Sequence, residues 1–198
     1  MSLDRPPSSL ADVRYGTITR FVDSRGSFRE LWKTSTFGPI DPAAAGAPSI
    51  RAPRFVQANL SASAVGVLRG LHFHLHQLDH WIVSSGRAFV ALVDVRPMLI
   101  DPLASPLVET RELVADAWVD IPTGVAHGFL ALEPLELIYL VTNEYDGTDE
   151  LGFAWDDPLA AVAWPTIAET ADGRPILSER DQTNPTLPEL VARLRAGT

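Results

Sequence analysis

The stretch VLRGLHFHLHQLDHWIVSSGRAFVALVDVR, residues 67–96, contains the pattern that decides the fold of this chain. In its first part apolar residues alternate with histidines, and successive side chains of a strand point to opposite faces of the sheet. His72, His74 and His76 therefore share one predicted face, and His80 has the same parity. The apolar run that follows is typical of a buried strand. We predict buried strands that carry histidines on one face.

The fifth histidine of the chain, His127, stands in IPTGVAHGF, residues 121–129, directly after a Pro-Thr-Gly turn. Histidines that decorate a solvent-exposed face are the simplest alternative to a site. Long apolar stretches flank these histidines, however, which is typical of residues that face the inside of a barrel. We therefore expect a functional site.

The rest of the chain consists of short predicted strands separated by turns. Many short strands at regular spacing, without helices between them, predict a β-sandwich or a β-barrel. Residues 38–53, rich in Pro, Ala and Gly, form a predicted surface loop, and only residues 187–195 have helical periodicity. The predicted strands cover 14–22, 27–32, 55–61, 66–74, 80–84, 88–94, 109–113, 118–121, 128–132 and 136–142.

Composition limits the classes of function. A chain of 198 residues with 46% hydrophobic content buries a sizeable core, and we expect one domain over residues 1–198. A net charge of -9 argues against a nucleic-acid partner, which needs a basic surface. The absence of cysteine excludes disulfides and thiolate ligands. No stretch is long and apolar enough to span a membrane, and the start of the chain lacks a signal-peptide pattern, so we expect a cytoplasmic protein with a small-molecule partner.

One pattern of histidines resembles the metal-binding signature of cupins. In that pattern His72, His74, Asp79 and His127 are the metal ligands, with Asp79 where a glutamate usually stands. Imidazoles together with a carboxylate suit Fe, Zn, Mn or Ni. The match is incomplete, because Asp116 occupies the position of a glycine that usually precedes the second part of the signature.

A longer resemblance rests on the motifs VDSRGSFRE, QANLSASAVGVLRGLHFH, IPTGVAHGFLALE, YLVTNEYDGTDELGFAWDDP and LSERD. In this order they resemble the dTDP-4-dehydrorhamnose 3,5-epimerase family over most of residues 22–181. The resemblance implies a mainly β fold, a cupin-like double-stranded β-helix (jelly-roll) barrel with a short C-terminal helix. It also implies a homodimer that works without a metal or another cofactor. The implied activity is epimerisation at C3, C5 or both of a dTDP-linked 4-keto-6-deoxy sugar in deoxysugar biosynthesis.

The same resemblance implies three catalytic residues. His72, in the RGLH motif, is the expected base, and Asp181, in SERD, is expected to hold its second nitrogen. Tyr139 is the expected acid on the opposite face of the sugar, and a phenol with an ordinary pKa near 10 is protonated at neutral pH, as that role requires. Without the resemblance, Tyr139 is explained by strand packing and Asp181 by a turn or a helix cap.

Other residues in these motifs match positions that contact the nucleotide or the sugar in the family. Some of these contacts are made across the dimer interface. An acidic protein must concentrate its cations where phosphates bind, and two of the matched residues are arginines. The expected substrate-binding residues are Arg25, Phe28, Glu30, Gln57, Asn59, Arg69, His74, His80, His127 and Tyr145.

Two of these positions depart from the family. His74 stands where the family usually has glutamine, and His80 is assigned to the position of a lysine credited with stabilising the enolate. Lysine is cationic at pH 7, whereas an ordinary histidine is mostly neutral. The change leaves three alternatives to double epimerisation on the family's substrate: epimerisation at one carbon, a different 4-keto sugar nucleotide, or another reaction from the same enolate. A metal-dependent cupin enzyme and a nucleotide-sugar-binding protein with weak activity also stay open.

Overall fold

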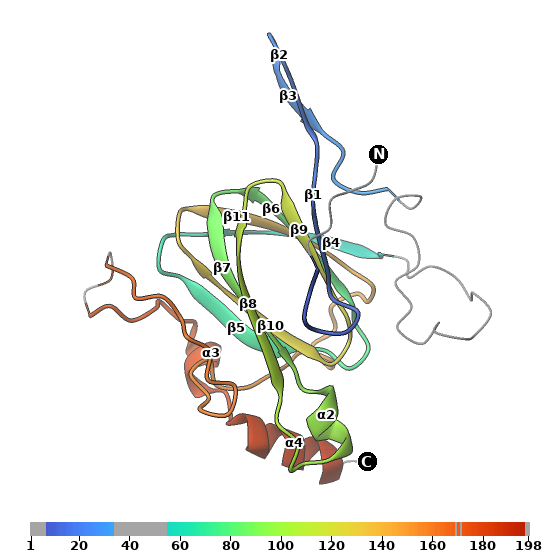
Figure 1. Ribbon diagram of the computed structural model, residues 1–198, viewed down its shortest axis with the longest axis vertical. Helices are drawn as coiled ribbons and strands as arrows, with labels where there is room; N and C mark the ends of the chain where they lie inside the picture. The colour runs from blue at the N-terminus through green and yellow to red at the C-terminus, as the bar shows by residue number, and fades with distance from the viewer. Residues whose placement is uncertain (1–6, 34–54, 169, 171, 197–198) are drawn as a thin grey trace, which may run out of the picture.

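Two five-stranded antiparallel sheets face each other and form a barrel in the computed structural model, which describes residues 7–33, 55–168, 170 and 172–196 (Figure 1). The loop predicted over 38–53 lies outside the described residues. The first sheet has the order β1 (Arg14–Thr17), β9 (Ala117–Ile121), β6 (Asp79–Ser85), β11 (Leu135–Val141) and β4 (Gln57–Ser63). The second has the order β12 (Leu151–Gly152), β5 (Leu68–Phe73), β10 (Val125–Ala131), β7 (Arg87–Asp94) and β8 (Leu107–Val114).

The main hydrophobic core lies between the two sheets. Alternate residues of the central strands point inward, as the apolar alternation predicts. The turn between β6 and β7 contains Gly86 at a φ of 83°, a left-handed conformation that glycine adopts without steric cost. The inward residues of the central strands include Trp81, Val83, Leu92, Phe129 and Leu137.

Short helices cover the outer face of the second sheet at one end of the barrel (Figure 1). The predicted C-terminal helix is α4 (Leu187–Ala196), which buries Leu190 and Val191 against Phe73 of β5. Two more helices, α2 (Arg96–Ile100) and α3 (Glu179–Thr183), have five residues each and were not predicted. A segment of that length is too short to show helical periodicity. Among the described residues, no helix has the length and apolar composition required to cross a bilayer.

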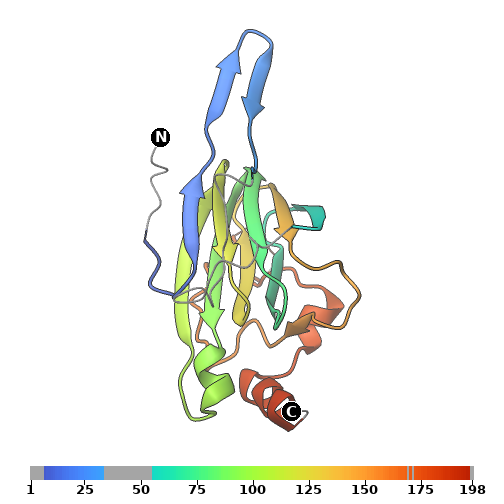
Figure 2. The same cartoon turned by 90° about the vertical axis from the view of Figure 1, so that its right-hand side faces the viewer.

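A hairpin projects from the opposite end of the barrel (Figure 2). It consists of β2 (Arg20–Asp23) and β3 (Gly26–Arg29). The single strand predicted over 14–22 is therefore two strands: β1 pairs with β9 in the first sheet, and β2 pairs only with β3. The two strands separate where the backbone N–H of Ile18 bonds to the carbonyl of Asp116, after which the chain leaves the barrel.

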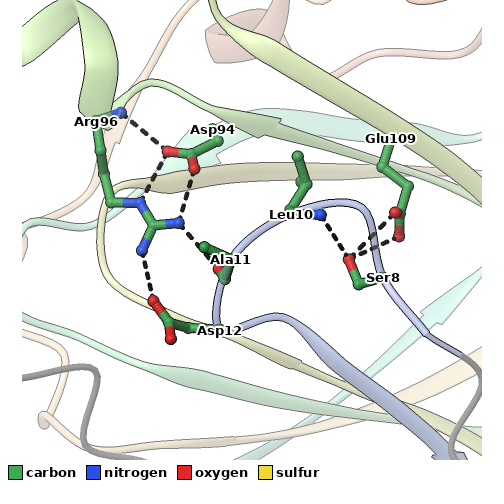
Figure 3. A network of polar contacts seen from close by, with 7 residues as sticks. All are labelled: Ser8, Leu10, Ala11, Asp12, Asp94, Arg96 and Glu109. Carbon is green, nitrogen blue, oxygen red and sulfur yellow. Dashed lines mark hydrogen bonds and ion pairs between the residues drawn. The ribbon is translucent and has the colours of Figure 1, made fainter. Parts of the chain in front are cut away.

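The N-terminal segment is attached to the barrel by a polar network (Figure 3). The Arg96 guanidinium donates two hydrogen bonds to Asp94, at 2.8 and 2.7 Å, one to Asp12 at 3.2 Å and one to the carbonyl of Ala11 at 2.9 Å. On the other side of the segment, the hydroxyl of Ser8 donates to Glu109 of β8 at 3.1 Å. These bonds hold the segment across the end of β7 and β8, far from the hairpin.

Candidate active site

A pocket of about 620 Å³ opens between the two sheets, a size typical of small-molecule sites. Side chains from β5 and β10 form one wall, and side chains from β4, β6 and β11 form the other. Residues 143–150, which follow β11, line its mouth. The barrel therefore places polar residues of both sheets around one cavity.

His72 and Asp181 form a hydrogen-bonded pair at the edge of this pocket. His72 Nε2 lies 2.6 Å from Asp181 Oδ1, and the two side chains are 21% and 3% exposed. Asp181 lies in the first turn of α3, where its backbone N–H donates to the side chain of Ser178, the N-cap. The short helix thus brings to β5 a carboxylate that lies 109 residues later in the chain.

The protonation of Asp181 fixes the roles of the imidazole nitrogens. Burial alone raises the pKa of Asp181, but the hydrogen bonds from His72 and Ser178 leave this pKa below its ordinary value. Asp181 is therefore a carboxylate and can only accept, so His72 donates from Nε2. The lone pair of the neutral imidazole is then on Nδ1.

Tyr139 reaches the pocket from β11, in the opposite sheet. Burial raises the pKa of the Tyr139 phenol, and the carboxylates of Asp79 and Glu150 raise it further against the opposing effect of Arg69. The phenol is therefore protonated at neutral pH and can give a proton to a bound molecule.

A close approach of β5 and β10 places two histidines side by side. His127 of β10 is the direct partner of His72 in the register of the two strands. Beside them, a Cβ atom on Gly70 would lie 2.6 Å from the Cα of Gly128, so the two glycines permit this approach. The Pro-Thr-Gly turn before β10 is present, with Gly124 at a φ of 75°.

A second polar cluster occupies the pocket beside this pair. One ligand-type atom from each of His74, Asp79 and His127 lies within 4.8 Å of the others. Burial lowers the pKa of His127 to about 4, against the attraction of Asp79. His127 is therefore neutral at pH 7, and its Nε2, 3.6 Å from Asp79 Oδ2, does not form an ion pair with that carboxylate. Of the four ligands in the cupin pattern, His72 is not part of this cluster, because its Nε2 faces Asp181.

The placement of His80 in the sugar site is wrong. The loop between β5 and β6 interrupts the alternation, so the parity of the first three histidines does not carry over to β6. His80 is fully buried on the outer face of β6, where its Nδ1 lies 2.6 Å from Asp120 and its ring packs against Trp118. The neighbouring residue Asp79 faces the pocket instead.

The expected nucleotide-binding residues fall into two groups. Gln57 and Asn59 of β4 line the pocket and are joined by a hydrogen bond of 2.8 Å, while the Gln57 carbonyl accepts from the backbone N–H of Tyr145 at 2.9 Å. Arg69 also lines the pocket and donates to Ser63 at 3.2 Å. Arg25, Phe28 and Glu30 belong to the projecting hairpin or directly follow it, outside the pocket of their own chain.

Several pocket residues were not predicted from the sequence. The carboxylate of Asp149 accepts backbone hydrogen bonds from Leu75 and His76, which fastens the loop over residues 143–150 to the end of β5. Glu150 pairs with Arg180 at 2.6 Å in the same wall. Asp149 and Glu150 lie inside a family motif, which was the available signal, but only the folded chain shows what they hold.

The family model described as dTDP-4-dehydrorhamnose 3,5-epimerase matches residues 7–189. The chain belongs to this family. It is 33% identical over 190 residues to the dTDP-4-dehydrorhamnose 3,5-epimerase of Sinorhizobium fredii, covering 92% of this chain and 88% of that protein. It is 34% identical over 181 residues to the dTDP-4-dehydrorhamnose 3-epimerase of Streptomyces niveus, covering 89% of this chain and 80% of that protein.

Solved structures give the same result. The RmlC epimerase of Mycobacterium tuberculosis matches with a TM-score of 0.76 and 31% identity, covering 98% of this chain and 92% of that chain. The Legionella pneumophila RmlC in complex with dTDP-4-keto-L-rhamnose matches with a TM-score of 0.77 and 28% identity, covering 97% and 96%. The predicted jelly-roll fold and the predicted class of enzyme, an isomerase of the epimerase type, are confirmed.

Proposed function

We propose that this protein epimerises a dTDP-linked 4-keto-6-deoxy sugar at C3, C5 or both, with His72 as base and Tyr139 as acid. The observation that carries the proposal is the pair of His72 and Asp181 on one wall of a pocket whose opposite wall holds a protonated Tyr139. An epimerase needs a base and an acid on opposite faces of its substrate, and this arrangement supplies both. The family of the chain and the ligands named for its relatives support the choice of substrate.

The reaction begins with removal of a proton from a carbon next to the C4 carbonyl. C3 and C5 both adjoin C4, so either proton is acidified by the same carbonyl group. His72 accepts the proton on Nδ1, and the electron pair of the C–H bond passes to the C4 oxygen as an enolate. Asp181 stabilises the resulting imidazolium, because its carboxylate accepts the hydrogen bond from Nε2.

Tyr139 then delivers a proton to the opposite face of the same carbon. Because its pKa is raised, the phenol is protonated when the enolate forms, and the C–H bond forms with inverted configuration. The remaining binding assignments follow the two groups of residues found in the structure. Gln57, Asn59, Arg69, Tyr145, His74 and His127 contact the substrate within one chain, while Arg25, Phe28 and Glu30 contact it in a partner chain.

This division predicts a homodimer in which the hairpin of one protomer reaches the pocket of the other. The hairpin exposes Phe21, Val22 and Phe28 by 58%, 74% and 69%, and the outer face of β4 exposes Leu60 by 63%. Exposed apolar side chains of this size are typical of contact surfaces. The single-domain organisation and the cytoplasmic location stay predictions from the sequence.

The test of the activity is incubation with dTDP-4-keto-6-deoxyglucose in D2O. We expect deuterium at C3, at C5 or at both, read by mass spectrometry and NMR, and the labelled carbon identifies the site of epimerisation. The relatives include both a 3,5-epimerase and a 3-epimerase, so this label is the informative result. No exchange at either carbon, in protein that binds dTDP, would exclude this substrate.

The dimer is tested by mixing two inactive variants. His72→Ala keeps the hairpin and loses the base, whereas Arg25→Ala keeps the base and alters the hairpin. If hairpins are exchanged, a mixed dimer has one site with both intact parts, and random mixing restores about a quarter of the wild-type rate. A mixture that stays inactive while light scattering reports dimers would show that each hairpin serves its own chain.

A further inference from the structure

The cluster of His74, Asp79 and His127 has no role in the proton transfers described above. Its three side chains come from both sheets: His74 directly follows β5, His127 lies on β10, and Asp79 begins β6. Asp79 and His127 are buried, and His74 is partly buried. Buried polar groups are normally paired with complementary groups, so the way in which these atoms face one another is informative.

Both imidazoles present an unprotonated nitrogen to the cluster. His74 Nδ1 contacts the backbone carbonyl of Asp149, and His127 Nδ1 contacts that of Val125 at 3.2 Å. A carbonyl only accepts, so each Nδ1 carries the proton and each Nε2 carries a lone pair. Histidines that bind metals are oriented in this way, with the second nitrogen donating to a carbonyl or a carboxylate.

The third member of the cluster is also an acceptor. His127 Nε2 faces Asp79 Oδ2 across 3.6 Å, which is too long for a hydrogen bond. Gln77 donates to Asp79 at 2.8 Å and to His74 Nε2 at 3.2 Å, and the Trp81 indole donates to Asp79 at 3.1 Å. Within the part of the chain that the structure describes, no hydrogen bond to His127 Nε2 is found. The lone pair of His127 Nε2 therefore lies within 4.8 Å of the Asp79 carboxylate and of His74 Nε2. The Gln77 amide, which bridges Asp79 and His74, would have to turn aside for an ion to contact all three residues.

We propose that His74 Nε2, His127 Nε2 and the carboxylate of Asp79 bind one divalent transition-metal ion. Two imidazoles and one carboxylate form a donor set that suits Zn²⁺, Fe²⁺, Co²⁺ or Ni²⁺ and does not suit Mg²⁺. Ligands about 2.1 Å from such an ion lie roughly 3.0–3.4 Å from one another, close to the 3.6 Å between His127 and Asp79. All three residues line the pocket, so an ion held by them would lie beside a bound sugar.

The position of this ion gives it a chemical use, which rests on the proposed function. An enolate oxygen needs a positive charge or hydrogen-bond donors. The sequence places the family's lysine position at His80, but the residue of this stretch that lines the pocket is Asp79, a carboxylate. Among the described residues, the arginines and lysines that line the pocket are Arg69 and Arg180, and Arg180 is paired with Glu150. A divalent ion held by Asp79 would restore the positive charge beside the sugar.

The test is titration of the untagged full-length protein, first freed of metal with a chelator, with Zn²⁺ by calorimetry and with Co²⁺ by visible absorption. We expect one equivalent per chain, and no heat with Mg²⁺. Asp79→Asn and His127→Ala should each weaken Zn²⁺ binding by at least about 100-fold, since loss of a ligand exceeds the 10–100-fold effect of its supporting groups. Circular dichroism checks that each variant is folded. If Asp79→Asn and His127→Ala do not fold, His74→Ala, at a less buried position, provides the same test.

His76→Ala is the matched control, because His76 lines the same pocket but is not part of the cluster. It should keep the stoichiometry and the affinity. Absence of Zn²⁺ and Co²⁺ binding, or binding that Asp79→Asn leaves unchanged and His76→Ala abolishes, would overturn the proposal. Metal-free protein that exchanges deuterium at full rate and binds no Zn²⁺ would refute the metal site and support the proposed epimerase function. Specific Zn²⁺ binding without exchange on any 4-keto sugar would support the metal site and refute the proposed epimerase function.

Discussion

Two histidine–aspartate pairs of equal length belong to the two different sheets of the barrel, one pair at the pocket and one on the outer face. His72 and Asp181 are 2.6 Å apart at the pocket, and His80 and Asp120 are 2.6 Å apart behind it. The inner histidine is 21% exposed and its partner comes from a short helix, whereas both members of the outer pair are fully buried and its partner comes from the neighbouring strand β9. The same two residue types thus form the proposed catalytic pair where a small molecule can reach the imidazole, and a fully buried pair where none can.

The largest expected difference follows from removing the inner histidine. His72→Ala should lower the rate of deuterium exchange by about 10²–10⁴-fold, the usual contribution of a general base. Its free energy of unfolding should fall by about 1–2 kcal/mol, less than for the outer histidine, because Asp181 keeps its hydrogen bond from Ser178. Exchange measured on purified protein, with urea unfolding alongside, checks both; full retained exchange would contradict the role of base.

Removing the outer histidine should have the opposite effect. His80→Ala leaves a cavity against Trp118 and deletes one partner of the buried Asp120, whose other partner, Arg14 at 2.9 Å, remains. The free energy of unfolding should fall by about 2–4 kcal/mol. The exchange rate per folded molecule should stay within about an order of magnitude of wild type. A loss of exchange as large as that of His72→Ala would mean that the outer pair takes part in the reaction.

Replacing each aspartate by asparagine, which has nearly the same shape, tests the two pairs more finely. Asp181→Asn replaces an obligate acceptor by an amide that can impose the wrong tautomer on His72, so turnover should fall by about 10²-fold or more while dTDP binding is kept. Asp120→Asn weakens the bonds from Arg14 and His80 and should lower the free energy of unfolding by about 1–3 kcal/mol with a small effect on turnover. Equal effects of the two amides on turnover would contradict the distinction.

The smallest expected effect concerns Tyr139, the proposed acid. Because burial and Asp79 raise the pKa of Tyr139, its phenol should ionise at a higher pH than an ordinary phenol. In metal-free protein, the tyrosinate absorbance of wild type minus that of Tyr139→Phe isolates this group. Asp79→Asn should move the midpoint to lower pH, because the carboxylate that opposes ionisation is gone. A wild-type midpoint below pH 10 would contradict the assignment.

The sequence by itself determined the strands, the turns and the family. Side chains alternate along a strand whatever the rest of the chain does, so the alternation around His72 and His74 and the turn glycines Gly86 and Gly124 were readable locally. The motifs also pointed to Asp181 and Tyr139, which no local pattern brings near His72. The division of residues 14–22 into two strands was not readable, because both pieces have the same pattern and differ only in their partners.

Only the tertiary structure decided which side of the wall each polar residue faces. A parity argument holds within one strand, and the loop after His74 resets it, so Asp79 enters the pocket and His80 is buried behind it. Which nitrogen of each histidine is free depends on carbonyls and carboxylates supplied by distant segments, such as Asp181 in α3 and Asp149 in the loop after β11. The packing of the whole barrel brings these partners to the histidines. For that reason the proximity of His74, Asp79 and His127 is visible only in the folded chain.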